Sequence, residues 1–212
     1  MPAPKPLEPG KFYHLYNRGN NRENIFIEER NYRYFLEQYA KYIHPIADTY
    51  AYCLLRNHFH LLVRIKSLDE VAKIRGQGSE RSEALRSFSP IATFATRGFQ
   101  SLFKAYAMAI NKGYGRTGKL FQEHFGRIEV DSDNYFTNLI FYIHFNPQKH
   151  GFVKDFREWV WSSYSAMHLN GATKLKRSEV LNWFDGATYF DQFHKGAVDE
   201  KMIAKLIADD FD

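Results

Sequence analysis

Short apolar-rich runs alternate along the chain with longer segments in which apolar residues recur at helical spacing. The runs at residues 11–18, 48–55 and 58–65 are bounded by turn-forming residues and predict three strands. Between the first two strands, aromatic and aliphatic side chains at helical spacing predict an amphipathic helix over residues 28–43, which Pro45 closes. We therefore expect the first third of the chain to form a strand, a helix and two further strands.

The same alternation resumes after a polar segment. Residues 74–90 are rich in Gly, Ser and charge, and we expect them to form a flexible insertion that follows a short helix beginning within residues 67–72. A longer helix is predicted over residues 94–111 and a fourth strand over residues 121–130. The last helix of this region is expected to begin at a cap within residues 131–133 and to end at Asn146, before Pro147.

This order of elements predicts an α+β class protein with a ferredoxin-like (RRM-like) fold, in which a four-stranded antiparallel sheet has helices on one face. We expect residues 1–154 to form this body and residues 155–212, which contain all three tryptophans, to form a helical C-terminal extension packed on it. RNA-recognition modules share the layout, so the fold alone does not select a function.

Composition and charge narrow the class of protein. Apolar residues make up 44% of the chain and aromatic residues 17%, which suffices for a core, and the single cysteine excludes an intramolecular disulfide. No apolar run approaches the roughly 20 residues of a membrane span, and the first residues lack the pattern of a secretory signal, so we expect a cytoplasmic protein without a membrane partner.

The distribution of charge points to one kind of partner. Residues 1–130 contain 20 Lys and Arg against 12 Asp and Glu (+8), whereas residues 131–212 contain 9 against 12 (−3). A basic body with many aromatic residues suits nucleic acid, and a mildly basic solvated surface is the alternative.

A His-x-His pair lies in the third predicted strand. Because side chains alternate between the two faces of a strand, His58 and His60 share one face, and the apolar residues between and after them share the other, buried face. Two imidazoles on an exposed strand face can bind one cation together. The alternative is a pair of surface histidines beside an apolar run.

The last predicted helix contains Tyr142 and Asn146, which are four residues apart and therefore share a face. Its apolar stripe should pack on the sheet and leave the Tyr142 hydroxyl accessible; the stripe consists of Phe136, Leu139, Ile140 and Ile143. A purely packing tyrosine and a helix stop at Asn146-Pro147 are the alternatives.

Together these groups suit phosphodiester chemistry. A tyrosine hydroxyl, with a pKa of about 10, is a poor nucleophile at neutral pH and gains from a metal ion that polarises the phosphate. The imidazoles of His58 and His60 and the amide oxygen of Asn146 would hold such an ion and leave positions open for phosphate oxygens. Mn²⁺ or Mg²⁺ suits this donor set better than zinc, which usually has a third His, Cys or carboxylate ligand.

As a set, the motifs resemble the single-tyrosine transposases of the HUH class (His, hydrophobic residue, His), and most closely the REP-associated tyrosine transposases and related insertion-sequence enzymes. The matching segments follow the family's order and are YHLYNRG (13–19), AYCLLRNHFHLLV (51–63), GKLFQEHFG (118–126), YIHFNP (142–147) and WSSY (161–164). They span residues 11–165. Leu55-Arg56 stands where the family often has Met-Pro, which removes no ligand.

The resemblance implies a metal-dependent enzyme, using Mg²⁺ or Mn²⁺, that binds single-stranded or hairpin DNA and cleaves and rejoins it through a 5′-phosphotyrosine. Tyr142 is then the nucleophile, and His58, His60 and Asn146 are the metal ligands. Residues expected to contact phosphates are Arg18, Arg22, Arg56, Arg64, Lys112, Arg116, Lys119 and Arg127, and those expected to stack on bases are Tyr13, Tyr16 and Phe121. Such a protein would associate with the nucleoid when bound to DNA, and it is a candidate homodimer.

Two other functions fit parts of the pattern. A non-catalytic RNA-binding module would share the fold but has no use for converging His58, His60 and Asn146. A metal-dependent phosphodiesterase would use the same metal with water, in place of Tyr142, as nucleophile. Only the transposase forms a covalent adduct with DNA. A host-serving relative of a mobile-element enzyme has the same chemistry, and the sequence leaves that choice open.

Overall fold

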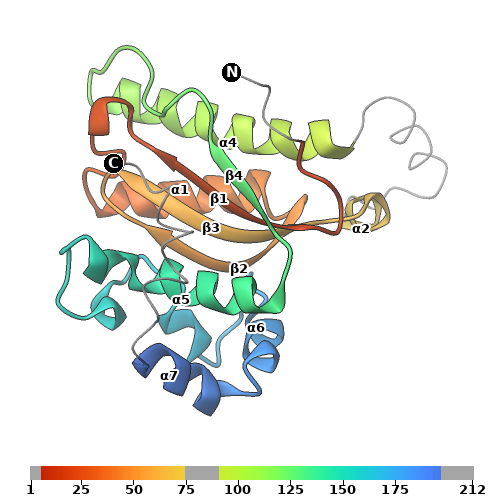
Figure 1. Cartoon of the computed structure of the whole chain (residues 1–212). Coiled ribbons are helices and arrows are strands. Elements are labelled where there is room, and N and C mark those ends of the chain that lie inside the picture. The colour runs from red at the N-terminus through yellow and green to blue at the C-terminus, as the bar shows by residue number, and fades with distance from the viewer. Residues whose placement is uncertain (1–5, 75–90, 197–212) are drawn as a thin grey trace.

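A computed structural model describes residues 6–74 and 91–196 (Figure 1). Its sheet contains β1 (Phe12–Arg18), β2 (Ala47–Leu54), β3 (His58–Ile65) and β4 (Gly126–Val130), in the order β2-β3-β1-β4. All neighbouring strands are antiparallel. This order, with helices between β1 and β2 and between β3 and β4, confirms the expected ferredoxin-like α+β fold.

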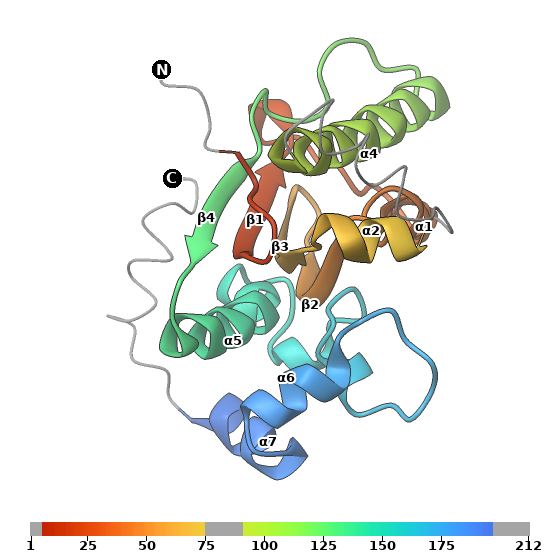
Figure 2. The same ribbon diagram turned by 90° about the vertical axis from the view of Figure 1, so that its right-hand side faces the viewer.

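Two helices cover one face of the sheet. α1 (Glu29–Tyr42) and α4 (Ile91–Gly113) lie side by side there, and α2 (Leu68–Ile74) follows β3 at the sheet's end (Figure 2). The odd-numbered positions of β3 point into this layer, so Phe59, Leu61 and Val63 join the aromatic side chains of α1 and α4 in one core. The predicted buried face of the third strand is thereby confirmed.

The other face is covered by α5 (Asp133–Lys149), the last of the helices predicted for this region (Figures 1 and 2). Ser132 caps its first turn by accepting from the Tyr135 amide. The predicted end at Asn146 is wrong by one turn. The helix includes Pro147, and the backbone continues with the His150 amide bonded to the Asn146 carbonyl at 3.0 Å.

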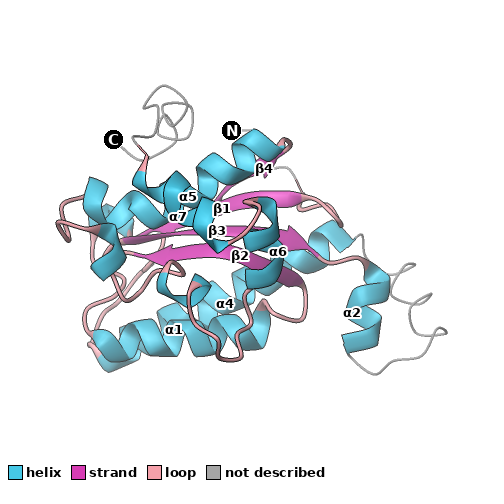
Figure 3. Cartoon of the chain, turned by 90° about the horizontal axis from the view of Figure 1, so that it is seen from below, coloured by secondary structure: helices cyan, strands magenta, loops and turns pink. Residues whose placement is uncertain are grey.

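The C-terminal extension packs under α5 and along β2 (Figure 3). It contains α6 (Arg177–Trp183), α7 (Ala187–Lys195) and the short 3₁₀ turns Phe156–Glu158 and Ser165–Met167. Backbone hydrogen bonds tie it to the outer edge of β2, where the Leu54 amide donates to the Trp161 carbonyl at 2.9 Å and the Ser163 amide donates to the Tyr52 carbonyl at 2.9 Å. Irregular segments connect these elements, so the part up to residue 196 is only partly helical, and a domain boundary at residue 154 stays a prediction.

Smaller differences concern element ends. The fourth strand begins at Gly126 and not at residue 121, because Phe121 makes only an isolated bridge with Gly19. A further short 3₁₀ turn, Asn20–Arg22, follows β1. The predicted insertion at residues 74–90 lies, apart from Ile74, outside the described residues. Among the helices in the described ranges, none has the length and apolar character needed to cross a membrane.

Candidate active site

The paired central strands bring three histidines together on the face that α5 covers. In the β1–β3 register, Tyr16 lies opposite His60 and Arg18 opposite His58, and His14 is one step further along the same face of β1. The rings of His58 and His60 are 5.2 Å apart, as are those of His14 and His60. His58 and His60 therefore lie side by side, as predicted.

The prediction that this strand face is exposed is wrong. Only 6% of His58 and none of His60 is exposed to solvent. The physical reason is α5, whose apolar residues pack against β2 and β3 and close this face of the sheet. The histidines are thus at a buried interface between the sheet and a helix.

Tyr142 enters the same interface from α5. Its ring lies 5.6 Å from that of His60 and 6.2 Å from that of His14, with the rings edge-on in both cases. The predicted accessibility of its hydroxyl is wrong, because Tyr142 is fully buried: α5 contacts the sheet on one side and the C-terminal extension on the other. The hydroxyl nevertheless has no hydrogen-bond partner among the described residues.

Asn146 is one helical turn further along α5 and is also fully buried. Its Nδ2 donates to the Tyr142 carbonyl at 3.1 Å, which fixes the plane of the amide. The amide lies close enough to His58 to raise the pKa of that ring slightly against the effect of burial, although Oδ1 is not in hydrogen-bonding geometry with any described residue. An amide oxygen beside His58 is thus available as a ligand.

Hydrogen bonds to the Nδ1 atoms of His58 and His60 limit which ring nitrogen can carry the proton. The Oδ1 of Asn57 can only accept, so at 2.8 Å it holds the proton of His58 on Nδ1 and leaves Nε2 with its lone pair. The Nδ1 of His60 lies 2.9 Å from the Nε2 of His14. His14 and Asn57 lie within the motifs at 13–19 and 51–63, but no pattern in the sequence predicts a role for either.

Burial keeps all three rings neutral. Loss of hydration lowers the pKa of His14 and of His58 to about 3 each and that of His60 well below its ordinary value, and neighbouring positive charge adds to the effect at His58 and His60. A neutral imidazole is the form that binds a metal ion. The site is therefore ready to donate lone pairs at neutral pH without first losing protons.

The donor set fits a divalent cation that accepts mixed nitrogen and oxygen ligands. Within the described ranges there is no cluster of three or more His, Cys, Asp and Glu side chains arranged to hold a metal, so a closed zinc site of the usual kind is not found there. Two neutral imidazoles and an amide oxygen that lacks a hydrogen bond make a more open set, which suits Mn²⁺ or Mg²⁺ with phosphate and water completing the coordination.

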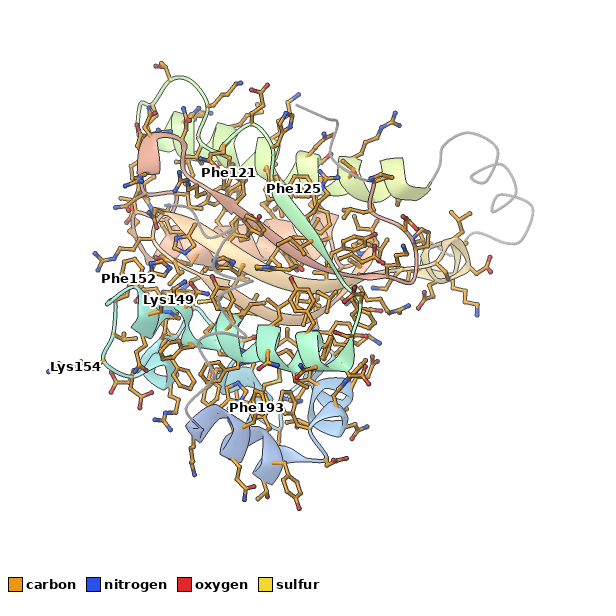
Figure 4. All side chains as sticks on the ribbon, in the orientation of Figure 1. Phe121, Phe125, Lys149, Phe152, Lys154 and Phe193 are labelled. Atoms are coloured by element: carbon orange, nitrogen blue, oxygen red, sulfur yellow. The ribbon has the colours of Figure 1, made fainter. Side chains whose placement is uncertain are left out.

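A lysine that sequence reasoning missed lies against the tyrosine. The Nζ of Lys149 is 5.0 Å from the centroid of the Tyr142 ring, and Figure 4 shows its side chain at the C-terminal end of α5. Burial lowers the pKa of this half-buried ammonium. The sequence did contain a signal for it. Lys149 follows Tyr142 by seven residues, about two turns of helix, so the two side chains lie on the same side of α5.

Known proteins resemble the chain in sequence and in fold. No family model matches the chain. A Haemophilus influenzae protein provisionally named a REP-associated tyrosine transposase is 26% identical over 117 residues, which are 55% of this chain and 58% of that relative. The chain thus matches less than two thirds of the relative's length. A solved structure of a REP-associated tyrosine transposase bound to a REP hairpin matches with a TM-score of 0.56 and 17% identity, over 82% of this chain and 87% of that one.

The resemblance to REP-associated tyrosine transposases is confirmed. It rests on two separate lines, a sequence match over about half of the chain and a shared fold over most of it. The roles of individual residues are not decided by either comparison and stay predictions.

The basic residues predicted to contact DNA phosphates do not form one group. Arg18 ends β1 opposite His58, Arg22 follows in the adjoining turn, and Arg56 precedes Asn57 in the turn between β2 and β3. These three lie at the end of the sheet where the histidines are, so they remain the best placed for a phosphate bound at the site.

Four others of the set are engaged within the protein. Arg64 lies at the opposite end of β3 in ion pairs with Asp48 and Glu70. Arg116 pairs with Glu23, and Lys119 with Glu123 at 3.2 Å. Arg127 stacks on Phe125 at 4.0 Å and lines a hollow of about 480 Å³ beside α4, the side of the sheet where Figure 4 shows Phe121 and Phe125. Lys112 is exposed at the end of α4.

Of the three predicted stacking residues, two belong to the core. Tyr13 and Phe121 are buried in the cluster between the sheet and the α1–α4 layer, so their predicted role in stacking on bases is wrong for this conformation. Tyr16 is half-buried on the other face, with its ring 6.0 Å from that of His60 and so close over Gly126 that no side chain fits there. Tyr16 alone keeps a place at the site.

Two further motif residues anchor α5. The Ser163 hydroxyl lies 2.8 Å from the Nε2 of His144, and the Nδ1 of His144 lies 3.0 Å from the Nε2 of His194 in α7. The Nδ1 of His194 donates to the Phe190 carbonyl at 2.8 Å, and Ser163 accepts from the Tyr52 amide at 2.9 Å. This chain of hydrogen bonds satisfies every polar group in it with both rings neutral. It connects β2 to α5 and α7, and so fixes the helix that carries Tyr142.

Proposed function

We propose that the protein is a transposase-like DNA endonuclease and strand transferase that acts on hairpin or single-stranded DNA with Tyr142 as its nucleophile. The observation that carries the proposal is the position of the Tyr142 hydroxyl, which is buried beside His60 and His14 and lacks a hydrogen bond to any described residue. A buried hydroxyl usually has a partner, because leaving it unpaired costs roughly 1–3 kcal/mol. If the Tyr142 hydroxyl is the reacting group, its function explains why the fold tolerates this cost.

The proposed reaction is a transesterification. The phenolic oxygen forms a bond to phosphorus while the bond from phosphorus to the DNA 3′-oxygen breaks. The phenol loses its proton and the departing 3′-oxygen gains one, so the products are a 5′-phosphotyrosine and a 3′-hydroxyl. Attack by another 3′-hydroxyl reverses the exchange and restores Tyr142. Each step replaces one phosphodiester by another, so rejoining needs no ATP, oxidant or reductant.

The other residues of the site have complementary roles. His58, His60 and Asn146 would hold a divalent cation, Mg²⁺ or Mn²⁺, which when bound polarises the phosphate. Lys149 is placed to attract a phosphate towards the phenol and to stabilise the phenolate that attacks. Arg18, beside His58, would add a second positive charge at the same end of the sheet.

The kind of DNA follows from the partner of the structural relative. That protein is bound to a REP hairpin, which supports a DNA hairpin with single-stranded flanks as the substrate of this chain. The full burial of Tyr142 means that a phosphodiester reaches the phenolic oxygen only after neighbouring groups move. We therefore infer that DNA binding changes the packing around Lys149 and the end of α5.

One rival keeps the site and changes the nucleophile. The burial of Tyr142 favours a metal-dependent phosphodiesterase in which water attacks. An RNA-binding module is less favoured, because such modules bind bases on the sheet face opposite their helices, and α5 covers that face in this protein.

The test compares Tyr142→Phe with the wild type on a labelled hairpin oligonucleotide with single-stranded flanks, in the presence of Mn²⁺. We expect hairpin binding to persist and both the denaturant-resistant adduct and strand cleavage to vanish. If water were the nucleophile, the variant would lose about one hydrogen bond, about 1 kcal/mol or roughly a tenfold loss of rate at most. Residual adduct-free cleavage at that level would identify the phosphodiesterase.

A matched control is Tyr50→Phe. Tyr50 is also buried, and its hydroxyl donates to Glu179 at 2.7 Å, away from the histidines. The same deletion of one oxygen there should leave adduct formation unchanged.

A further inference from the structure

His14 lies on the central strand β1 and contacts His60 on the face of the sheet that α5 covers. It is 1% exposed, its ring is stacked on that of His60 at 5.2 Å, and its Nε2 lies 2.9 Å from the Nδ1 of His60. Its other nitrogen, Nδ1, is buried and has no hydrogen-bond partner among the described residues. A hydrogen bond between two neutral imidazoles requires that exactly one of the two facing nitrogens carries a proton.

Two arrangements of protons satisfy this contact. In the first, His60 carries its proton on Nδ1 and donates to His14, which leaves a lone pair on the Nε2 of His60. In the second, His14 donates, and the proton of His60 moves to Nε2, which then cannot bind a cation. The neighbouring ligand has no such choice, because Asn57 holds the proton of His58 on Nδ1.

We propose that His14 is a positioning residue for the metal site, which accepts the Nδ1 proton of His60 and so presents the Nε2 lone pair of His60 beside that of His58. The inference rests on the proposed function, because it assumes that His58 and His60 bind a cation. With Asn57 and His14 as acceptors, both imidazoles are held at Nδ1 and keep their lone pairs on Nε2, and the two rings are 5.2 Å apart. Such partners orient a ligand and raise its basicity, and their removal typically lowers metal affinity by about 10- to 100-fold.

The apolar variant and the conservative one should behave differently. His14→Leu removes the acceptor and keeps a buried side chain, so we expect Mn²⁺ affinity, measured by electron paramagnetic resonance of free Mn²⁺, to fall by about 10- to 100-fold. His14→Gln supplies an amide oxygen that can accept the same proton, so we expect it to recover most of the affinity. Cleavage by His14→Leu should likewise need more Mn²⁺ and approach the wild-type rate at saturation.

His194→Gln is the matched control for loss of a buried histidine. His194 makes the same kind of bond to another histidine, at 3.0 Å, and is 3% exposed, but it belongs to the C-terminal extension. We expect its Mn²⁺ affinity to equal that of the wild type. An unchanged affinity in a folded His14→Leu protein, or an equal loss in His14→Leu and His14→Gln, would overturn the proposal.

A second measurement needs no variant. In ¹⁵N-histidine-labelled wild-type protein saturated with Mg²⁺, two-bond nitrogen–proton spectra should show His60 protonated on Nδ1 and His14 with an unprotonated Nε2. Protonation of His60 on Nε2 refutes the inference even if the variants do not fold. Failure of the proposed function has another signature: Mn²⁺ affinity would then be unaffected by His58→Ala, whatever the state of His14.

Discussion

Acidification should weaken the C-terminal anchor of α5 through His194. This ring is buried between α5 and α7, where it accepts from His144 and donates to the Phe190 carbonyl. Burial lowers its pKa to about 4, partly offset by the bond to Phe190 and by Asp191, while His168 and Arg157 lower it further. In the unfolded chain a histidine has a pKa of about 6.5. Between these two values the unfolded chain binds more protons than the folded one.

The sign and size of the effect follow from that difference. Because the folded pKa is the lower one, the free energy of unfolding falls as the pH falls through about 6.5, and the loss is complete below about pH 4. Between pH 7 and pH 5, linkage gives a loss of about 2 kcal/mol from His194 alone. Against a typical stability of roughly 5–15 kcal/mol, this is large enough to measure.

The assay is urea denaturation followed by circular dichroism at pH 7, 6 and 5, on the wild type and on His194→Gln. The glutamine can keep both hydrogen bonds but does not titrate, so its unfolding free energy should fall by about 2 kcal/mol less over this range. The control is His124→Gln, because His124 is exposed on the loop before β4. If His194→Gln and the wild type lose the same stability between pH 7 and pH 5, the buried, neutral state assigned to His194 is wrong.

Four further predictions concern the site and the charged surface. His58→Ala should abolish Mn²⁺-dependent cleavage while circular dichroism and hairpin binding persist, and full activity would remove His58 from the ligand set. Arg64→Ala should lower the unfolding free energy by about 1–3 kcal/mol, because Asp48 loses one of its partners, and should leave hairpin affinity within about twofold; a large affinity loss in fluorescence anisotropy would place Arg64 at the DNA. Lys149→Met should slow adduct formation at saturating hairpin by at least about tenfold, and an unchanged single-turnover rate would rule out its action on Tyr142. Metal-free hairpin binding should weaken steeply with salt, with Arg22→Ala reducing the slope of log affinity against log salt by about 1, a change that a salt titration would detect or exclude.

The fold followed from local patterns because each pattern had one consistent solution. The alternation in HFHLLVRI assigns Phe59 and Leu61 to the core and His58 and His60 to the opposite face, and no other register does so. The start of α5 was predictable because Ser132 is a typical N-cap residue. Its end lies one turn later than predicted, because the helix tolerates Pro147 and continues with the bond from the His150 amide to the Asn146 carbonyl.

The proximity of the candidate site residues was predictable and their environment was not. His58, His60, Tyr142 and Asn146 do converge, as their motifs indicated. Their burial was missed because it depends on which face of the sheet α5 covers, and hydrophobic periodicity along one helix does not contain that information. The apolar stripe of α5 was recognised, but Tyr142 also lies on the sheet side of the helix, against His60 and His14, and is therefore out of solvent. A role for His14 could not be predicted, because it depends on a contact with His60, which is 46 residues away in the sequence.

The pairing along β2 also bears on solubility. An unpaired outer strand invites edge-to-edge association with other chains, and proteins commonly cover such edges. Here the outer edge of β2 is occupied by the segment that follows α5, through the bonds of Leu54 with Trp161 and of Tyr52 with Ser163 and a bridge from Thr49 to Leu175. A chain cut near residue 154 would bare this edge together with the apolar underside of α5. The extension therefore protects the edge of β2 from association with other chains. A fragment that ends near residue 154 should be recovered from inclusion bodies more readily than from the soluble fraction.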